Sequence, residues 1–181
     1  MAKQVMRGSK MPKLIYTIGH STHPIEDFID LLKSYEIEML IDVRTIPKSR
    51  HNPQFNKETL ETVLKEFDIQ YHHLSKLGGL RHTTKESVNV GWHNLSFRGF
   101  ADYMQTSFFL QGIEELEILG KKYKSAIMCA EAVPWRCHRS LIADALTLRK
   151  WKVFHITSKK SAKLHELTSF LQIMDGQLIY P

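Results

Sequence analysis

The chain has 181 residues, 43% of them hydrophobic and 24% charged, a balance that excludes a disordered chain, a fibrous rod and a polytopic membrane protein. Most of the net charge of +6 comes from Lys3, Arg7, Lys10 and Lys13, in a segment without acids. Because the rest of the chain is nearly neutral, a pervasive basic face for nucleic acid is not indicated.

These features divide the chain into a short tail and one domain. We predict a basic tail over residues 1–12 and a single domain over 13–181, since about 150 residues per domain is usual. The N-terminal segment lacks the apolar stretch of a signal peptide, and no run approaches the roughly 20 apolar residues of a membrane span. We therefore expect a cytoplasmic protein with no membrane partner. The two cysteines, Cys129 and Cys137, are too few for a disulfide-stapled secreted scaffold.

Short apolar runs predict the strands, and apolar residues at helical spacing predict the helices. The predicted strands are Lys13–Ile18, Glu38–Val43, Ile69–Leu74, Ser125–Cys129 and Lys152–Ile156. The predicted helices cover residues 24–36, 56–67, 100–120 with a break near 106–107, and 138–150. A short helical piece is expected over 164–171, then a turn at Asp175-Gly176 and a final extended segment. Residues 75–99 contain no clear element, and such a long loop is usually functional or mobile.

The alternation of strands with helices decides the fold class. It predicts a three-layer α/β domain with a mostly parallel, Rossmann-like central sheet of about five strands and helices on both faces. In such open sheets, ligands bind outside the carboxyl ends of the strands. We therefore expect the functional site where several strands end in polar residues.

Four predicted strands lead directly to side chains that carry chemistry. The segments are Gly19-His20-Ser21, Asp42-Val43-Arg44, Gly78-Gly79 with Arg81, and the stretch from Cys129 through Glu131 to Cys137-His138-Arg139. The last stretch suggests an anion cradle, in which a strand end is followed by a loop and by an Arg-Ser helix start. The same positive potential lowers the pKa of a thiol and makes it a nucleophile.

We assign provisional roles on this basis. Cys129 or Cys137 is the nucleophile, and Glu131 and His20 are the candidate proton carriers. Asp42 is expected to orient His20 or to pair with Arg44. The predicted anion-binding residues are Ser21, Arg44, Arg81, Arg136, His138 and Arg139.

Each of these interpretations has an alternative. Cys129 can simply be a small buried residue, and Asp42 with Arg44 can be a structural ion pair. A redox pair of Cys129 and Cys137 is permitted by their separation. A metal site is also possible, because Cys129, Cys137, His138, Glu131 and His20 are all acceptable zinc or iron ligands, although their spacing matches no known zinc motif.

Several motifs occur in order along the chain: Ile18-Gly19-His20-Ser21, Ile41-Asp42-Val43-Arg44, Asn52-Pro53-Gln54-Phe55, Leu77-Gly78-Gly79, Phe97-Arg98-Gly99, Cys129-Ala130-Glu131 and Cys137-His138-Arg139-Ser140. In this order and spacing the sequence resembles the prokaryotic family catalogued as domain of unknown function 488, over nearly the whole chain after Lys13. The resemblance implies a cytosolic α/β domain and supplies no reaction.

A weaker likeness is to rhodanese-type sulfurtransferases, which also have an Ile-Asp-Val-Arg-like strand end and a cysteine before an Arg-Ser helix start. The loop here is longer than theirs and carries Pro134, Trp135 and a second cysteine. The cysteine-phosphatase pattern is not met either, because six residues rather than five separate Cys129 from Arg136. The likeness supports the thiol hypothesis by analogy of site logic alone.

The sequence therefore favours a small enzyme, a thiol-dependent transferase or hydrolase that acts on an anionic small molecule or nucleotide. The alternative is a nucleic-acid or nucleotide-binding module whose phosphate clamp consists of Arg44, Arg50, Arg81, Arg136 and Arg139. The cofactor, the metal and the oligomeric state are left open by the sequence.

Overall fold

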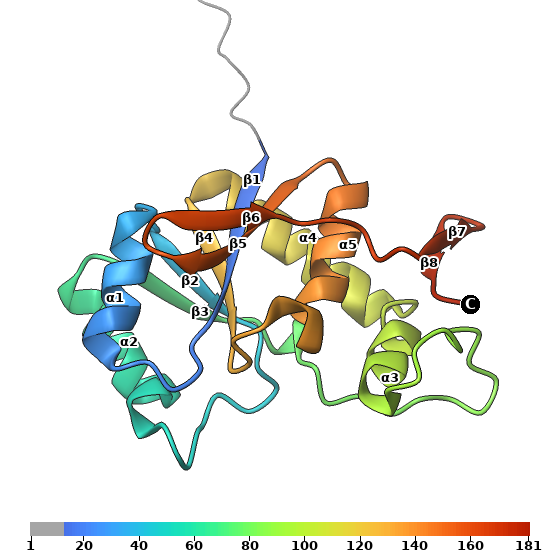
Figure 1. The fold of residues 1–181 in the computed structure, drawn as a ribbon, viewed down its shortest axis with the longest axis horizontal. Coiled ribbons are helices and arrows are strands. Elements are labelled where there is room, and N and C mark those ends of the chain that lie inside the picture. The colour runs from blue at the N-terminus through green and yellow to red at the C-terminus, as the bar shows by residue number, and fades with distance from the viewer. Residues whose placement is uncertain (1–12) are drawn as a thin grey trace, which may run out of the picture.

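Six strands form the central sheet of the computed structural model, which describes residues 13–181 (Figure 1). They are β1 (Leu14–Gly19), β2 (Met39–Asp42), β3 (Gln70–His73), β4 (Ser125–Cys129), β5 (Lys152–Ser158) and β6 (Ser161–Leu164). The order is β3-β2-β4-β1-β5-β6, and all pairs are parallel except β5 with β6. The predicted mostly parallel α/β sheet is confirmed, with one antiparallel edge strand added. The predicted basic tail lies outside the described residues.

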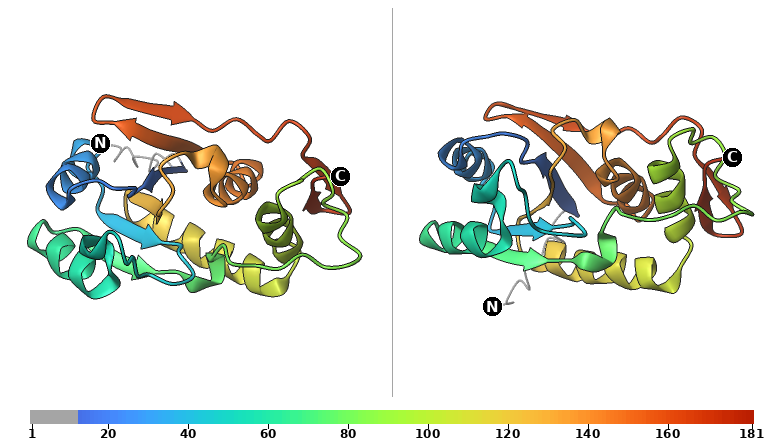
Figure 2. Two further views of the ribbon diagram at one scale, coloured as in Figure 1. Left: turned by 60° about the horizontal axis from the view of Figure 1, so that its bottom comes forward. Right: turned by 90° about the horizontal axis from the view of Figure 1, so that it is seen from below.

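Helices cover both faces of this sheet, which gives the three layers (Figure 2). One layer holds α1 (Ile25–Ser34) and α2 (Lys57–Glu66), and the other holds α3 (Leu95–Tyr103), α4 (Ser107–Lys122) and α5 (Arg139–Leu148). Residues alternate between the faces along each strand: in β1, Ile15 packs with the α4 and α5 layer, and Ile18 packs with the α1 and α2 layer. Among the helices of residues 13–181, none combines the length and apolar character needed to cross a membrane.

Local sequence accounts for the helix boundaries. Pro24 precedes α1, where its missing N–H costs no helical hydrogen bond. The predicted break near residues 106–107 is confirmed, because Thr106 Oγ1 accepts a hydrogen bond from the backbone N–H of Phe109 and starts α4 as a new helix. Asn94 Oδ1 caps α3 in the same way, through the N–H groups of Ser96 and Phe97.

The predicted helical piece over 164–171 is wrong. Leu164 ends β6, and the N–H of His165 bonds to the carbonyl of Val153 at 2.8 Å, which continues the strand pairing. The segment then crosses to α5, where Thr168 bonds to Asp144. Contacts with the sheet edge and with α5 therefore override the helical spacing of the leucines. The turn at Asp175-Gly176 is confirmed and joins a separate hairpin of β7 (Gln172–Met174) and β8 (Gln177–Ile179).

The long segment before α3 is tied down by one carboxylate. In the segment from residue 75 to residue 94, the one regular element is the short 3₁₀ turn η2 (Ser75–Leu77), and α3 begins at Leu95. Asp102 of α3 accepts hydrogen bonds from Ser87 Oγ at 2.6 Å and from Asn89 Nδ2 at 2.7 Å. These bonds hold the later part of the segment against α3. Its first part stays at the carboxyl edge of the sheet because the N–H of Leu80 bonds to Oγ1 of Thr45, which follows β2.

Candidate functional site

The carboxyl ends of β2, β4 and β1 lie side by side, and the chain leaves them toward different faces of the sheet. β1 and β2 lead to the α1 and α2 layer, whereas β4 leads to α5 on the opposite face. Both flanks of β4 are therefore switch points, where a crevice opens for a ligand. The N–H of His20 bonds to the carbonyl of Cys129 at 2.9 Å, so the predicted residues of β1 and β4 meet at this edge.

Two cysteines and one histidine come together at the end of β4, and we call these three residues the thiol centre: Cys129, Cys137 and His138. Nδ1 of His138 lies 3.6 Å from Sγ of Cys137 and 4.0 Å from Sγ of Cys129. Nε2 of His138 lies 3.1 Å from the carbonyl of Val43. A carbonyl only accepts, so Nε2 of His138 donates to Val43, and Nδ1 is the ring nitrogen that faces the two sulfurs.

Close packing holds the His138 ring in this orientation. Its edge meets Phe100, with ring centroids 5.0 Å apart. On its other side the backbone of Gly79 approaches so closely that a Cβ there would lie 2.6 Å from Nδ1. Of the predicted Gly78-Gly79 pair, Gly79 therefore leaves room for the imidazole, whereas a Cβ at Gly78 would meet Thr45.

Arg139 is the buried cation of the site. It is 1% exposed and donates from Nε to Sγ of Cys137 at 3.4 Å, from Nη1 to Oγ1 of Thr17 at 3.2 Å, and from Nη2 to the carbonyl of Glu131. Within residues 13–181 it forms no ion pair with a carboxylate. Because a buried charge needs a counter-charge, the Cys137 sulfur is the group placed to supply one.

The two thiols differ in their electrostatic surroundings. A hydrogen bond from Cys129 lowers the pKa of Cys137, and His138 and Arg139 lower it further against the opposing effect of burial. The hydrogen bond to Cys137, followed by burial, raises the pKa of Cys129. These opposite shifts make Cys137 the more acidic thiol of the coupled pair. Both thiols are free, with Cys137 buried and Cys129 half-buried.

A second polar cluster surrounds Asp42 and lies behind the thiol centre. Asp42 is fully buried and pairs with Arg44 at 2.6 Å, and the Tyr71 hydroxyl donates to the same carboxylate at 2.6 Å. Nδ1 of His20 donates to the carbonyl of Ser21, and its Nε2 accepts from Nη1 of Arg44 at 3.4 Å. Burial lowers the pKa of His20 to about 4. Both ring nitrogens are thereby engaged, and the ring stacks on Phe55.

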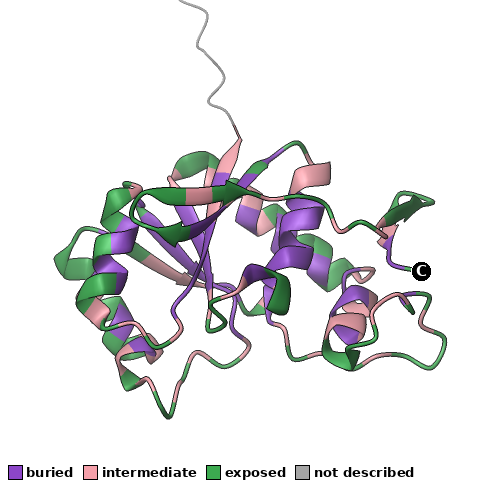
Figure 3. Cartoon of the chain, viewed as in Figure 1, coloured by how far each residue is buried: buried purple, intermediate pink, exposed green. Residues whose placement is uncertain are grey.

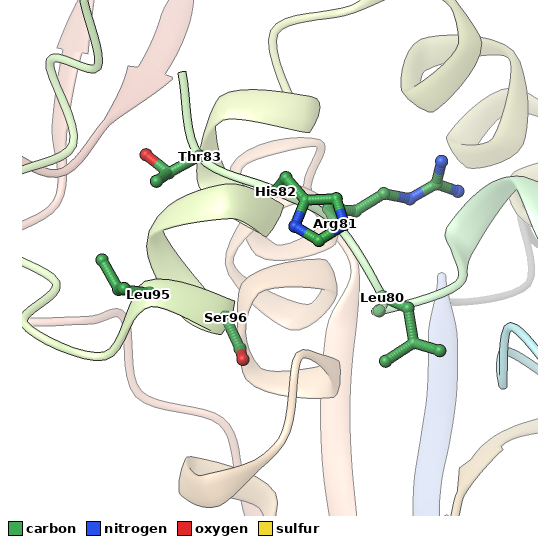
Figure 4. Close-up of a pocket in the computed structure, with 7 residues that line it drawn as sticks. Leu80, Arg81, His82, Thr83, Leu95 and Ser96 are labelled. Atoms are coloured by element: carbon green, nitrogen blue, oxygen red, sulfur yellow. The ribbon is translucent and has the colours of Figure 1, made fainter. Parts of the chain in front are cut away.

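A pocket of about 350 Å³ opens in front of the thiol centre. Its lining includes all three members of the centre together with Glu131, Lys48 and Arg136, of which the last two are exposed cations. A second pocket of about 480 Å³ adjoins it and shares Gly79, Leu80 and Ser96 (Figure 4). We call the two cavities, which have these three lining residues in common, the recess.

The remaining predicted residues lie at the periphery of this recess or are used internally. Glu131 is exposed, and its Oε1 accepts from the N–H of Val133. Arg81 lies over the Tyr103 ring at 3.6 Å and donates to the carbonyl of Gly78. Ser21 sits in a left-handed turn with φ 45°. Of the predicted arginine clamp, Arg50 and Arg136 are exposed, whereas the other three donate their hydrogen bonds within the fold.

Of the five residues predicted as possible metal ligands, the structure brings three together. The ligand atoms of the thiol centre lie within 4.8 Å of one another, and no other His, Cys, Asp or Glu of residues 13–181 joins them. Glu131 and His20 therefore stay apart from the set. Three donors are one fewer than a structural zinc site uses, and they equal the protein ligands of a catalytic zinc site. The cation of Arg139 lies directly against one of the two sulfurs.

Buried histidines make the stability of the fold depend on pH. Burial lowers the pKa of both His20 and His155 to about 4, while an unfolded histidine titrates near 6.5. Between these values the unfolded chain binds more protons, so the stability present above pH 6.5 is lost as the pH falls toward 4. We expect a loss of about 2 kcal/mol for each ring between pH 6.5 and 5, seen as a lower midpoint of urea unfolding. Titrating the Cys137→Ser variant removes the contribution of the thiol, and an unchanged midpoint in that variant would contradict the expectation.

Four polar residues beyond Arg139 were not predicted from the sequence: the buried Thr17, Asp144 and His155, and the half-buried His165. Three of them lie inside regular elements rather than at strand ends, where the site was sought. One signal was available, because Asp144 stands in the otherwise apolar run Leu141–Leu146. A charge in the buried stretch of a helix needs a polar partner.

The comparisons with known proteins identify a family and nothing finer. A family model described as "Domain of unknown function DUF488" matches residues 24–146, most of the chain. This confirms the resemblance drawn from the motifs. Comparison with curated proteins and with solved structures gives no match.

Proposed function

The chain belongs to the DUF488 family, and we propose that it is an enzyme whose Cys137 thiolate attacks an anionic substrate in the pocket before the thiol centre. The observation that carries this proposal is the buried Arg139 guanidinium, whose Nε lies 3.4 Å from the Cys137 sulfur. A buried arginine stays charged, and with no carboxylate paired to it in residues 13–181 it favours the ionised thiol.

The pocket supports an anionic substrate. Lys48 and Arg136 stand at its lining as exposed cations, and helix α5 starts at its floor with His138 as the capping residue. The amides at a helix N-terminus attract negative charge. The adjoining cavity along Gly79 to Thr83 gives the uncharged remainder of a longer substrate a place to lie.

The chemistry is nucleophilic substitution at a sulfur, phosphorus or carbon centre. Sγ of Cys137 forms a bond to that centre, and the bond to the leaving group breaks with its electron pair. The leaving group takes a proton from Cys129, whose raised pKa keeps it protonated. A second acceptor or water then releases the product, which makes the enzyme a transferase or a hydrolase.

The test compares an anionic with a neutral alkylating reagent of the same size. Iodoacetate is expected to modify Cys137 faster relative to iodoacetamide than it does with a free thiol, because Lys48 and Arg136 attract the carboxylate. Lys48→Gln and Arg136→Gln are each expected to lower that ratio by about two- to fivefold, which is the effect of an exposed charge pair. The modified cysteine is identified by peptide mass analysis.

A control variant and a metal analysis complete this test. Lys85→Gln, an exposed lysine outside the residues that line this pocket, serves as the matched control and should leave the ratio unchanged. Metal analysis of the purified protein is made before alkylation. A tightly held stoichiometric metal lost on Cys129→Ala or His138→Ala would overturn the bare-thiol mechanism, as would equal ratios for the protein and a free thiol.

A further inference from the structure

Behind Arg139, a chain of hydrogen bonds runs through the interior away from the thiol centre. We call its four members the relay: Thr17, His155, His165 and Asp144. Thr17 Oγ1 contacts His155 Nδ1 at 2.7 Å, and His155 Nε2 contacts His165 Nδ1 at 2.9 Å. His165 Nε2 then contacts Asp144 Oδ1 at 2.8 Å. The thiol mechanism uses none of these side chains directly.

The chemistry of the partners gives the relay a direction. The Asp144 carboxylate only accepts, so Nε2 of His165 donates to it, and Nδ1 is the His165 nitrogen that faces His155. Burial lowers the pKa of His155 to about 4 and keeps that ring neutral. With its proton on Nε2, His155 accepts at Nδ1 from the Thr17 hydroxyl. The oxygen of that hydroxyl accepts a hydrogen bond from Nη1 of Arg139. Each hydrogen bond is therefore donated in the direction from Arg139 toward Asp144.

The relay links helix α5 to the sheet at two points of the helix. Arg139 and Asp144 both lie on α5, which is buried along most of its length (Figure 3). Thr17 and His155 are direct cross-strand partners in β1 and β5, and His165 follows β6. Asp144 and Thr17 are 0% exposed, and His155 is 7% exposed. The segments that carry the relay therefore fix each other in space.

The far end of the relay is fully satisfied. Asp144 also accepts from Thr168 Oγ1 at 2.7 Å, from Thr168 N at 3.0 Å and from the Tyr180 hydroxyl at 2.9 Å. These donors offset its charge locally. Asp144 is therefore not the direct counter-ion of Arg139, which leaves Cys137 in that position.

We propose that the relay positions Arg139: it fixes the direction of the guanidinium and thereby keeps Nε pointed at the Cys137 sulfur. This inference rests on the proposed function, in that Cys137 is taken to act as a thiolate. Nη1 is anchored by Thr17 and Nη2 by the carbonyl of Glu131, so the plane of the fork is fixed at two corners. A purely apolar contact would hold α5 on the sheet equally well, but it would not orient a cation.

The test breaks the relay at Thr17 with a variant of the same shape. In a Cys129→Ser background, the thiolate absorbance in the ultraviolet is followed against pH and reports Cys137 alone. Thr17→Val removes the hydroxyl that accepts from Nη1 of Arg139. Because the guanidinium is then less well directed at the sulfur, the pH midpoint of Cys137 ionisation is expected to rise by about one unit. Thr17→Ser keeps the hydroxyl and should restore the midpoint of the background protein.

Controls separate the relay from general loosening of the fold. Ser125→Ala removes another fully buried hydroxyl of the same sheet, on β4. Among residues 13–181, the Ser125 side chain bonds only to the carbonyl of Tyr123. It should leave the midpoint unchanged. If Thr17→Val does not fold, His155→Phe breaks the same chain with a ring of similar shape and takes its place.

The outcomes are distinct. A midpoint that moves with Thr17→Val but not with Thr17→Ser or Ser125→Ala supports the relay. An unmoved midpoint in the breaking variant, or an equal shift in Ser125→Ala, overturns it. If the background protein itself titrates like a free thiol, near pH 8.5, the proposed function fails, and the relay then has no thiolate to act upon.

Discussion

Replacing Cys137 by serine is expected to change the pH profile of alkylation of the protein more than any other single substitution. The wild-type rate with iodoacetamide should rise much less between pH 6 and 8 than the rate of a free thiol, because Arg139 and His138 lower the pKa of Cys137. In the Cys137→Ser variant only Cys129 remains, without that cation against its sulfur. A thiol of pKa about 8.5 then gains roughly 75-fold in thiolate between these pH values, and the rate should follow.

The shape of the profile is a better measure than the rate at one pH. Lowering the pKa of a thiol also lowers its intrinsic nucleophilicity, so most of the gain in ionised fraction is offset in the rate. Cys129→Ser is the matched control, since it removes one thiol and keeps Cys137 beside Arg139, and its profile should stay shallow. A steep profile in that control would show that Cys137 is an ordinary thiol and would remove the basis of the proposed mechanism.

Substitution of Asp42 is expected to cause the largest loss of stability. Asp42→Ala leaves the Arg44 guanidinium, which is 6% exposed, without its counter-charge, and it leaves the Tyr71 hydroxyl without its acceptor. Breaking a buried ion pair by removing one partner costs about 3–5 kcal/mol. Urea unfolding at pH 7.5 should show this loss as a large fall in the midpoint.

The double variant Asp42→Leu with Arg44→Met provides the control. It removes both charges and fills the space with apolar atoms, so it should be less destabilised than Asp42→Ala. Thiol reactivity should also change in the single variant, because Val43 lies between the pair and its carbonyl holds His138. A loss below about 1 kcal/mol for Asp42→Ala would place the pair among weak, solvent-screened interactions.

The fold could be predicted from hydrophobic patterning because its parallel strands are buried. β2 and most of β4 are continuous buried runs, and such runs are distinctive in a sequence. β6 could not be predicted in the same way, since Ser161–Leu164 is mostly exposed and forms a strand only by pairing with β5. The apolar spacing of the following segment suggests a helix, but its polar groups serve the sheet edge and α5 instead.

The candidate site was partly predictable for a related reason. Strand ends are marked in the sequence by the change from apolar to polar residues, so Asp42, Cys129 and His20 could be placed at one edge. The relation of Cys137 to Arg139 could not be derived from spacing, because it depends on how the loop between β4 and α5 folds back over Gly19. The relay could not be predicted from the sequence because its two histidines come from segments that meet only when β5 and β6 pair.

The place of β4 in the sheet has a consequence for the order in which the protein is made. β4 lies between β2 and β1, yet it follows both in the chain: Met39 pairs with Ser125, and Tyr16 pairs with Ala126. As the polypeptide leaves the ribosome from its N-terminus, β1 and β2 emerge with a vacant place between them. Their facing edges stay unpaired until about 80 further residues have been synthesised, a long loop to close. Nascent chains halted before Ser125 would therefore expose both edges of β1, whose other partner β5 is also still missing, and the facing edge of β2. Unpaired strand edges of this kind favour aggregation and are what chaperones shield.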